Sequence, residues 1–420
     1  MKRIVHLGLG NFHRAHQAWY TAKAGGWKIT GVVMSNAALK AELSEHNNEF
    51  ILGTWGSNGL TTERISIYDQ VLLASENSTA VIESIADPET HVITLTVTEK
   101  GYLLTSPENR IETHLPPISL DLGSEPPKTA IGLLAAGLLR RRQNQGQPLT
   151  VISCDNLANN GSKLSEAIFD YISVDEPEAL SWISEHVAFP NSMIDRITPK
   201  LSANAHNEIC AEAGVKTAPV VGTEAFTEWV IEDAFKAPRP NWENAGAVLV
   251  ADVTSHEERK LRLLNAAHSY LAYAGLLAGY TFVHEAITDS DLRSNVNALW
   301  DEAAKTVSGP AAASLGSYRK ALLERFSVVE MRHRLDQIAT DGSLKLRERL
   351  LPVLLKRQSM GLESPMTLQA ISTWVEFVQS CVTNNQKLND PNDEKISAIV
   401  RDNSQDTSER LISLITDKSV

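Results

Sequence analysis

Three residues suited to proton transfer lie on one otherwise apolar segment: Lys260, Asn265 and His268. From Leu263 to Val283 the chain has 21 residues without a formal charge. If the segment is an α-helix, Asn265 lies about 140° and His268 about 80° around the axis from Lys260. The three side chains would then share one arc of the helix. An amine, an amide and an imidazole in such an arc could surround one small substrate and move a proton to or from its oxygen.

Two simpler interpretations of this segment stay open at this point. A run of about 20 apolar residues is long enough to cross a membrane. Asn265, His268, Ser269 and three tyrosines interrupt the run, however, and no second hydrophobic segment accompanies it. The other interpretation is a buried structural helix with incidental polar residues. The rest of the chain decides between a structural helix and a site.

Composition excludes several classes of protein. The 420 residues are 43% hydrophobic and 21% charged, as in an ordinary globular protein of two or three domains. A net charge of −12 argues against nucleic-acid binding, which needs concentrated Lys and Arg. Three widely spaced cysteines, Cys154, Cys210 and Cys381, indicate a reducing compartment. The amino terminus runs directly into a strand pattern without a signal peptide, so we expect a cytoplasmic protein with no membrane partner.

The first part of the chain has the pattern of an α/β fold. Apolar runs of strand length alternate with helical patterns, which is typical of a mostly parallel sheet covered by helices. The strand-like runs lie at residues 3–7, 28–34, 92–98, 149–154 and 247–253, and the helical patterns at 12–24, 129–142 and 162–172.

The second part of the chain is predicted to be entirely helical. Helical periodicity continues from residue 255 to the end, with no convincing strand. We therefore expect a Rossmann-type dinucleotide-binding domain at 1–253 and an all-α substrate domain at 254–420. The predicted helices lie at 256–278, 290–306, 310–326, 344–358, 365–382 and 393–416.

A glycine turn follows the first predicted strand. In Gly8-Leu9-Gly10, the first glycine permits a tight turn and the second allows backbone amides to approach a pyrophosphate. The third glycine of the dinucleotide fingerprint is replaced by His13, so a simple strand-to-helix turn stays an alternative. The predicted cofactor-binding residues are Gly8, Gly10, Asn11, Phe12 and His13.

Two further features bear on the ligand of this turn. The acidic residue that usually holds the ribose of NAD is absent, because Met34-Ser35-Asn36 occupies its place. NAD is the expected cofactor, but NADP is not excluded. His13 and His16 could be metal ligands, yet no nearby Cys, Asp or Glu completes a set, and we predict no metal.

Several segments together resemble the mannitol dehydrogenase family, the long-chain polyol and uronate dehydrogenases. The matches recur in order from residue 6 to about 346 and are jointly specific. They are Gly8-Leu-Gly-Asn-Phe-His-Arg-Ala-His-Gln17, Ser153-Cys-Asp-Asn156 with Asn160-Gly161, Asp195-Arg-Ile-Thr-Pro199, Lys260-x4-Asn265-x2-His268, and His333-Arg-Leu-Asp-Gln-Ile-Ala-Thr-Asp-Gly-Ser343.

The resemblance implies an active site between a Rossmann-type and a helical domain. It also implies zinc-independent hydride transfer between a nicotinamide cofactor and a secondary alcohol. Lys260 would be the general acid and base, and His268 would orient the substrate. Asn265 and Asn156 would hold the reacting oxygen, since two amide donors stabilise a developing alkoxide without adding charge. The simpler alternative for Asn156 is a helix cap.

Three residues are assigned to the rest of the substrate. Asp195 and Arg334 match positions that contact the polyol chain or its acid group, although Asp195 and Arg196 could instead form a structural ion pair. Glu99-Lys100-Gly101-Tyr102 looks like the fructuronate reductase branch of the family. Lys100 could pair with a carboxylate, or it could be an exposed loop lysine.

The expected reaction is therefore the interconversion of D-mannonate and D-fructuronate. The first alternative is a mannitol 2-dehydrogenase or arabinitol dehydrogenase acting on a free polyol. The distant alternative is a non-catalytic nucleotide-binding protein, which loss of Lys260, Asn265 or Asn156 would mark; all three are present. The expected partner is a small sugar acid or polyol, and the sequence is compatible with a monomer because it has no coiled-coil heptads.

Overall fold

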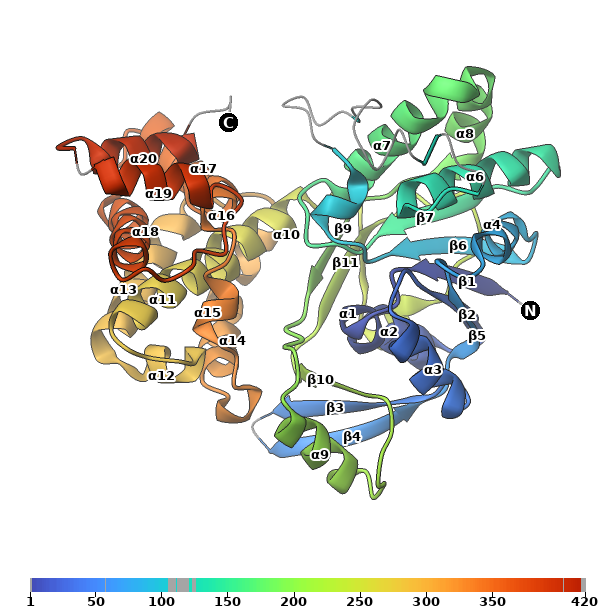
Figure 1. Cartoon of the computed structure of the whole chain (residues 1–420), viewed down its shortest axis with the longest axis horizontal. Coiled ribbons are helices and arrows are strands. Elements are labelled where there is room, and N and C mark those ends of the chain that lie inside the picture. Colours follow the sequence, from blue (N-terminus) through green and yellow to red (C-terminus); the bar gives the residue numbers. More distant parts are fainter. Residues whose placement is uncertain are drawn as a thin grey trace. The chain divides into compact units, whose positions relative to one another are not determined.

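The chain divides into two compact units, Met1–Val253 and Thr254–Val420. This computed structural model describes residues 2–56, 58–104, 111, 121–122, 126–402 and 404–416, without the side chains of Glu99 and Lys100. Figure 1 shows the sheets in the first unit and the helices that make up the second.

The first unit is built on a six-stranded parallel sheet. Its strand order is β5-β2-β1-β6-β7-β8, and each neighbouring pair runs parallel. If the strands of this sheet are numbered by their order along the chain, the order across the sheet is 3-2-1-4-5-6. This is the classical dinucleotide-binding arrangement. The predicted Rossmann-type fold is confirmed. The strands are β1 (Arg3–Leu7), β2 (Lys28–Val33), β5 (Tyr68–Leu73), β6 (Thr90–Leu95), β7 (Leu149–Ser153) and β8 (Val187–Ala188).

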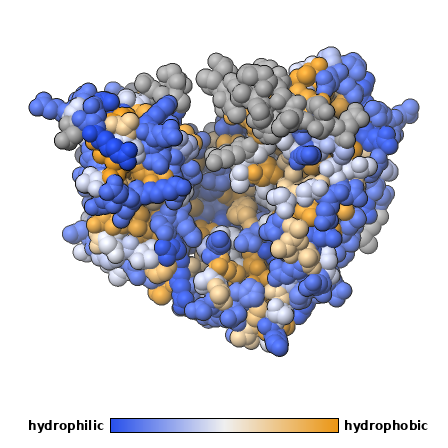
Figure 2. Space-filling model, in the orientation of Figure 1, coloured by the Kyte–Doolittle hydropathy of each residue, from blue (hydrophilic) through white to orange (hydrophobic). Residues whose placement is uncertain are grey.

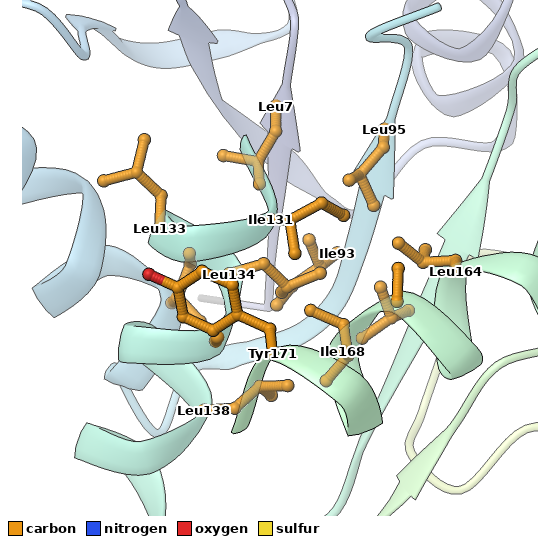
Figure 3. Close-up of a cluster of buried hydrophobic side chains, with 14 of the residues drawn as sticks. Leu7, Ile93, Leu95, Ile131, Leu133, Leu134, Leu138, Leu164, Ile168 and Tyr171 are labelled. Carbon is orange, nitrogen blue, oxygen red and sulfur yellow. The ribbon is translucent and has the colours of Figure 1, made fainter. Parts of the chain in front are cut away.

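Both faces of this sheet are buried, because successive side chains along each strand point to opposite faces and each face carries a hydrophobic cluster. Val5 and Leu7 of β1 belong to one hydrophobic cluster, whereas Ile4 belongs to another on the opposite face. In Figure 3, Leu7 lies beside Ile93 and Leu95 of β6 and among side chains of α6 and α7. The helices of this unit are α1 (Asn11–Ala15), α2 (Gln17–Ala24), α3 (Ala37–Glu45), α4 (Ser78–Ala86), α6 (Ala130–Gln143), α7 (Asn160–Asp175), α8 (Leu180–His186) and α9 (Ala203–Glu212).

Two small sheets flank the main one and were mostly not predicted. One has the order β10-β3-β4 and the other β12-β11-β9. β4 is polar and mostly only half-buried, and β9 to β12 have three to five residues each, so their apolar runs are short or absent. The strands are β3 (Phe50–Gly56), β4 (Gly59–Ile65), β9 (Ser192–Asp195), β10 (Val220–Glu224), β11 (Glu228–Glu232) and β12 (Val248–Val250).

The helix predicted at 12–24 is wrong in one respect. It is two helices, α1 and α2, which meet at His16. His16 has φ −123° and ψ −87°, far from helical values, so the backbone changes direction just after the glycine turn. Apolar spacing continues through this break, and for that reason the sequence does not reveal it.

The second unit is helical over its described residues, 254–402 and 404–416, apart from one isolated bridge between Phe282 and Arg334. The helix predicted at 344–358 ends near Leu350, because Pro352 begins a new helix there. The helices are α10 (Thr254–Arg259), α11 (Ala266–Leu277), α12 (Val283–Thr288), α13 (Ser290–Ala304), α14 (Leu315–Phe326), α15 (Leu335–Ile338), α16 (Gly342–Arg349), α17 (Leu351–Ser359), α18 (Pro365–Thr383), α19 (Asp393–Asp402) and α20 (Thr407–Thr416).

The long uncharged run lies inside this unit. Helix α11 ends at Leu277, and Ala266 to Tyr273 are all buried in the fold. Within the described ranges, no helix combines the length and hydrophobicity that a bilayer crossing requires. On the face seen in Figure 2, the surface is mostly hydrophilic, with separate apolar patches.

Candidate functional site

The helix that carries Lys260 and Asn265 is not α-helical where these residues lie. Between α10 and α11, residues Lys260–Asn265 form a π-helical turn, which we call the π turn. The amide of Ala266 donates to the carbonyl of Leu261, five residues earlier. In a π turn the hydrogen bond spans five residues instead of four, so Lys260 and Asn265, five residues apart, lie nearer to the same side than they would in an α-helix. The separation of about 140° expected from α-helical geometry is therefore wrong, and the pair is better aligned than predicted.

These side chains are buried and partly without partners. Lys260, Asn265 and His268 are 9%, 6% and 7% exposed. Within the described part of the chain, Nδ2 of Asn265 and Nε2 of His268 have no hydrogen-bond partner. Nearly all buried polar atoms in folded proteins are satisfied. On the segment that carries Lys260, these two atoms leave hydrogen bonds that a bound ligand could complete.

The imidazole of His268 is neutral at physiological pH. Its ring packs 4.7 Å from that of Phe326 and edge-on, 5.3 Å, to that of His333. Burial holds the pKa of His268 well below its ordinary value, and nearby positive groups lower it further. The neighbouring His333 acts in this direction when it is protonated, and the permanently charged groups are Arg325, Arg349 and Lys345. A neutral ring has one donor and one acceptor nitrogen, which suits a hydroxyl group.

Arg334, which the sequence assigns to the substrate, forms an ion pair at the surface. Its guanidinium is exposed and makes two hydrogen bonds, 2.9 and 2.7 Å long, to the carboxylate of Asp336. The preceding residue, His333, is the one that faces His268, and its burial lowers its pKa to about 4. The sequence does not show which of these two neighbours points inward, and the assignment of Arg334 to the substrate stays a prediction.

The glycine turn of the first unit can only be formed by glycine at its first position. Gly8 has φ +93°, and a Cβ there would lie 2.2 Å from the carbonyl oxygen of Thr96. The amides of Gly8 and Leu9 donate to the carbonyl of Val32, and the hydroxyl of Thr96 donates to that of Gly8. Gly10 is different, because a Cβ there would meet nothing closer than 3.7 Å. The backbone at Gly10 is therefore open to a ligand.

The next three residues lie at different depths. Asn11 is exposed, and its side-chain oxygen accepts a 2.7 Å hydrogen bond from Arg14. Phe12 is half-buried, whereas His13 is fully buried and stacks on His6 with ring centroids 3.4 Å apart. The ring of His13 therefore packs inside the first unit, and the assignment of His13 to the cofactor stays a prediction. Its ring supports the turn from beneath. Among the described residues, no group of three or more His, Cys, Asp or Glu is placed to hold a metal ion.

The stacked pair of histidines predicts acid sensitivity. Burial lowers the pKa of His6 to about 3 and that of His13 well below its usual range, where His6, Arg14 and His16 add like charge. Both rings bind protons more readily in the unfolded chain. The two neutral rings therefore make their full contribution to the free energy of unfolding above about pH 6.5. As pH falls below this value, the free energy of unfolding decreases by up to about 1.4 kcal/mol per pH unit for each ring.

Urea unfolding between pH 7 and pH 5 tests this. The variant His13→Phe removes one of the two rings that take up protons and keeps an aromatic ring on His6. We expect it to lose stability less steeply with falling pH than the parent protein, whatever its stability at pH 7. Equal slopes for the two proteins would show that His13 takes up no proton on unfolding.

Asp155 joins the loop after β6 to the end of β7. Its buried carboxylate accepts hydrogen bonds from the amides of Val97 (3.1 Å) and Thr98 (2.8 Å) and from the hydroxyl of Tyr102 (2.8 Å). Burial raises the pKa of Asp155, while these three donors act to lower it. Asn156 follows directly and is exposed. Asp155 is a positioning residue that was not predicted from the sequence, although it lies within the Ser153-Cys-Asp-Asn156 motif.

The same network fixes the short turn that carries Lys100. This turn, Glu99–Tyr102, is 3₁₀-helical, and its last residue donates to Asp155. The side chain of Lys100 lies outside the described residues. The turn itself is held by Tyr102, which is completely buried.

Asp195 is a buried residue at the end of β9. It is 1% exposed and pairs in register with Glu228 of β11. The guanidinium of Arg196 donates to the main-chain carbonyls of Glu224 and Ala15. Arg196 therefore ties the β9 segment to β10 and α1 through main-chain carbonyls.

The first unit has a doubly wound parallel sheet with a glycine turn after β1, and the helical unit carries a buried Lys, Asn and His. Together these features define a dehydrogenase of the Rossmann class. Comparison with protein families gives the particular family. The mannitol dehydrogenase Rossmann domain matches residues 2–244, and the mannitol dehydrogenase C-terminal domain matches residues 252–420. The chain belongs to the mannitol dehydrogenase family and is an oxidoreductase that acts on CH–OH groups.

Individual relatives agree with this family. The chain is 36% identical to the D-mannonate oxidoreductase of Escherichia coli K12 over 90% of this chain and 80% of that protein. It is 35% identical to a mannitol 2-dehydrogenase of Phaeosphaeria nodorum over 94% of this chain and 72% of the relative. A Pseudomonas fluorescens mannitol 2-dehydrogenase, solved as a ternary complex with NAD and D-mannitol, has a TM-score of 0.87 at 31% identity, covering 100% of this chain and 91% of that one.

Proposed function

We propose that the protein interconverts the ketone and secondary alcohol of a sugar acid, D-fructuronate and D-mannonate, with a nicotinamide cofactor. One observation carries the proposal: Asn265 and His268 hold buried polar atoms without partners, on the same helix as the buried amine of Lys260. In a family of alcohol dehydrogenases, an amine, an amide and an imidazole on one helix are suited to bind a carbinol oxygen.

The roles follow from the chemistry of each side chain. In the direction of reduction, Lys260 donates a proton to the ketone oxygen as that oxygen gains negative charge. The amide of Asn265 donates a hydrogen bond to the same oxygen, and we assign Asn156 of the first unit as a second donor. The neutral ring of His268 orients a neighbouring hydroxyl. The nicotinamide, when bound, supplies or accepts the hydride.

The glycine turn fits a dinucleotide. The open backbone at Gly10 leaves room for a pyrophosphate, and Gly8 sets the tight turn that exposes it. Exposed Asn11 and half-buried Phe12 border this place, so we assign them to the cofactor, with Gly8 and Gly10. We propose NAD as the preferred form, with NADP as the alternative that the assay below distinguishes.

Two observations favour a sugar acid. The D-mannonate oxidoreductase relative is 36% identical over 90% of this chain. His268 also lies in the positive field of Arg325, Lys345 and Arg349, which would attract a carboxylate. We assign Lys100, Asp195 and Arg334 to the far end of the substrate. This assignment requires Arg334 to leave its exposed pair with Asp336.

The second candidate is a mannitol 2-dehydrogenase. The high structural similarity to the Pseudomonas fluorescens enzyme favours it. A free ketose has no carboxylate, so it would gain nothing from the positive field around His268.

Ketone-dependent oxidation of reduced nicotinamide, followed by absorbance, tests the proposal. The panel is D-fructuronate, D-tagaturonate and D-fructose, each with NADH and with NADPH. We expect kcat/KM for D-fructuronate to exceed that for D-fructose by about tenfold to a hundredfold, the value of one charge-assisted hydrogen bond. A preference for D-fructose would establish the second candidate, and no turnover of any of the ketones would overturn both.

A further inference from the structure

We propose that Trp300 and Arg349 are positioning residues that hold the π turn open and so keep Asn265 on the same side as Lys260. Trp300 belongs to α13 and Arg349 is the last residue of α16. Neither was singled out by the sequence. The kinetic consequence rests on the function proposed above, but the geometric claim does not.

The π turn needs support from outside the helix. A π turn accommodates one residue more than an α turn, is rare, and often occurs at functional sites. If the segment wound as a regular α-helix, Asn265 would rotate to about 140° from Lys260. The two side chains would then no longer face one substrate oxygen. Contacts that favour the wide turn over the α-helical one therefore control the alignment of the pair.

Trp300 supplies the first of these contacts. Its indole nitrogen donates a 2.9 Å hydrogen bond to the carbonyl oxygen of Leu263, in the middle of the π turn. Both residues are completely buried. In a regular α-helix this carbonyl would accept from the amide four residues later. The amide of Ala266, three residues later, also donates to this carbonyl. The indole adds a donor from outside the helix at the place where the regular bonding pattern changes, which stabilises the turn.

Arg349 supplies the second contact, at the end of the turn. Its Nη1 atom donates to the carbonyl oxygen of Asn265 itself (3.3 Å) and to the hydroxyl of Ser269 (3.0 Å). The arginine thus fixes the backbone of the residue whose side chain is to bind substrate. Two donors from two different helices therefore hold two carbonyls of the same six-residue turn.

A conservative variant separates the hydrogen bond from packing. The ring of Trp300 lies 6.3 Å from that of Phe326, which in turn packs 4.7 Å from His268. Trp300→Phe keeps an aromatic ring in this stack and removes only the donor to Leu263. Trp242→Phe is a matched control, because Trp242 is also completely buried and its indole donates a 3.1 Å hydrogen bond, to Thr21 in the first unit.

The experiment measures kcat, KM, affinity for NADH and the thermal midpoint of the full chain. We expect both tryptophan variants to lose similar thermal stability. Only Trp300→Phe is expected to lower kcat for ketone reduction, by about tenfold to a hundredfold, which is the cost of a small misplacement. Its affinity for NADH is expected to stay unchanged. Equal kcat for the two variants would overturn the proposal.

A double-mutant cycle tests whether the effect passes through Asn265. In an Asn265→Ala background, Trp300→Phe is expected to lower kcat by less than twofold, since the group that it positions is gone. Full additivity would overturn the proposal.

A crystal structure of Trp300→Phe gives a readout independent of activity. We expect the backbone at Lys260–Asn265 to shift toward α-helical winding. An unchanged π turn would overturn the positioning role even if the substrate assignment were correct. Arg349→Gln, which leaves the buried core intact, supplies the same comparison if Trp300→Phe does not fold.

Discussion

Replacing Lys260 by alanine is expected to lower kcat for ketone reduction by about a hundredfold to ten-thousandfold, because a positioned acid contributes about that much. Loss of the acid leaves the developing alkoxide with only the amide of Asn265 and, as we propose, that of Asn156. Binding of NADH should be unchanged, since the glycine turn lies in the other unit. Steady-state kinetics and a fluorescence titration with NADH measure the two quantities.

A lysine outside the site provides the control for this variant. Lys320 belongs to α14, is 81% exposed, and lies 4.0 Å from Glu324. Lys320→Ala is expected to keep kcat within twofold of the parent, because a surface ion pair contributes little. Activity of Lys260→Ala within tenfold of the parent would contradict the assignment of Lys260 as the acid.

Replacing Gly8 by alanine is expected to destabilise the first unit by about 2–4 kcal/mol and to abolish measurable cofactor binding. The added Cβ would lie 2.2 Å from a main-chain oxygen that cannot rotate away, and alanine disfavours φ +93°. The tight turn between β1 and α1 must then open. The midpoint of urea unfolding and the affinity for NADH measure the two effects.

Gly10→Ala is the matched variant for this prediction. A Cβ there would meet no atom closer than 3.7 Å, and its φ of −142° is accessible to alanine. We expect nearly parental stability but weaker binding of NADH, because the methyl group occupies the space proposed for the pyrophosphate. If Gly8→Ala were as stable as Gly10→Ala, the account of the turn would be wrong.

The fold could be predicted where whole elements are buried and their residues are therefore apolar. Strands β1, β2, β6 and β7 are buried on both faces, so they read as continuous apolar runs between helical patterns. The hairpin β3–β4 could not be found in this way, because β4 is polar and only its last residue is buried. The break at His16 was missed since apolar spacing continues across it.

The site could be predicted in its residue types but not in its geometry. Lys260, Asn265 and His268 were selected by their chemistry and their family motif. The π turn that aligns the first two depends on Trp300 and Arg349, which are 40 and 89 residues away from Lys260 in the chain. Such long-range hydrogen bonds leave no local pattern. For the same reason the sequence did not show that His13 turns inward.

Transfer of deuterium from labelled cofactor tests the central claim most directly. The protein is incubated with D-fructuronate and NADH carrying deuterium at both positions of the reactive ring carbon, and the product is analysed by mass spectrometry. The account predicts D-mannonate heavier by one deuterium, bound to the former ketone carbon. Unlabelled mannonate, or no mannonate under conditions in which the folded protein binds NADH, would contradict it.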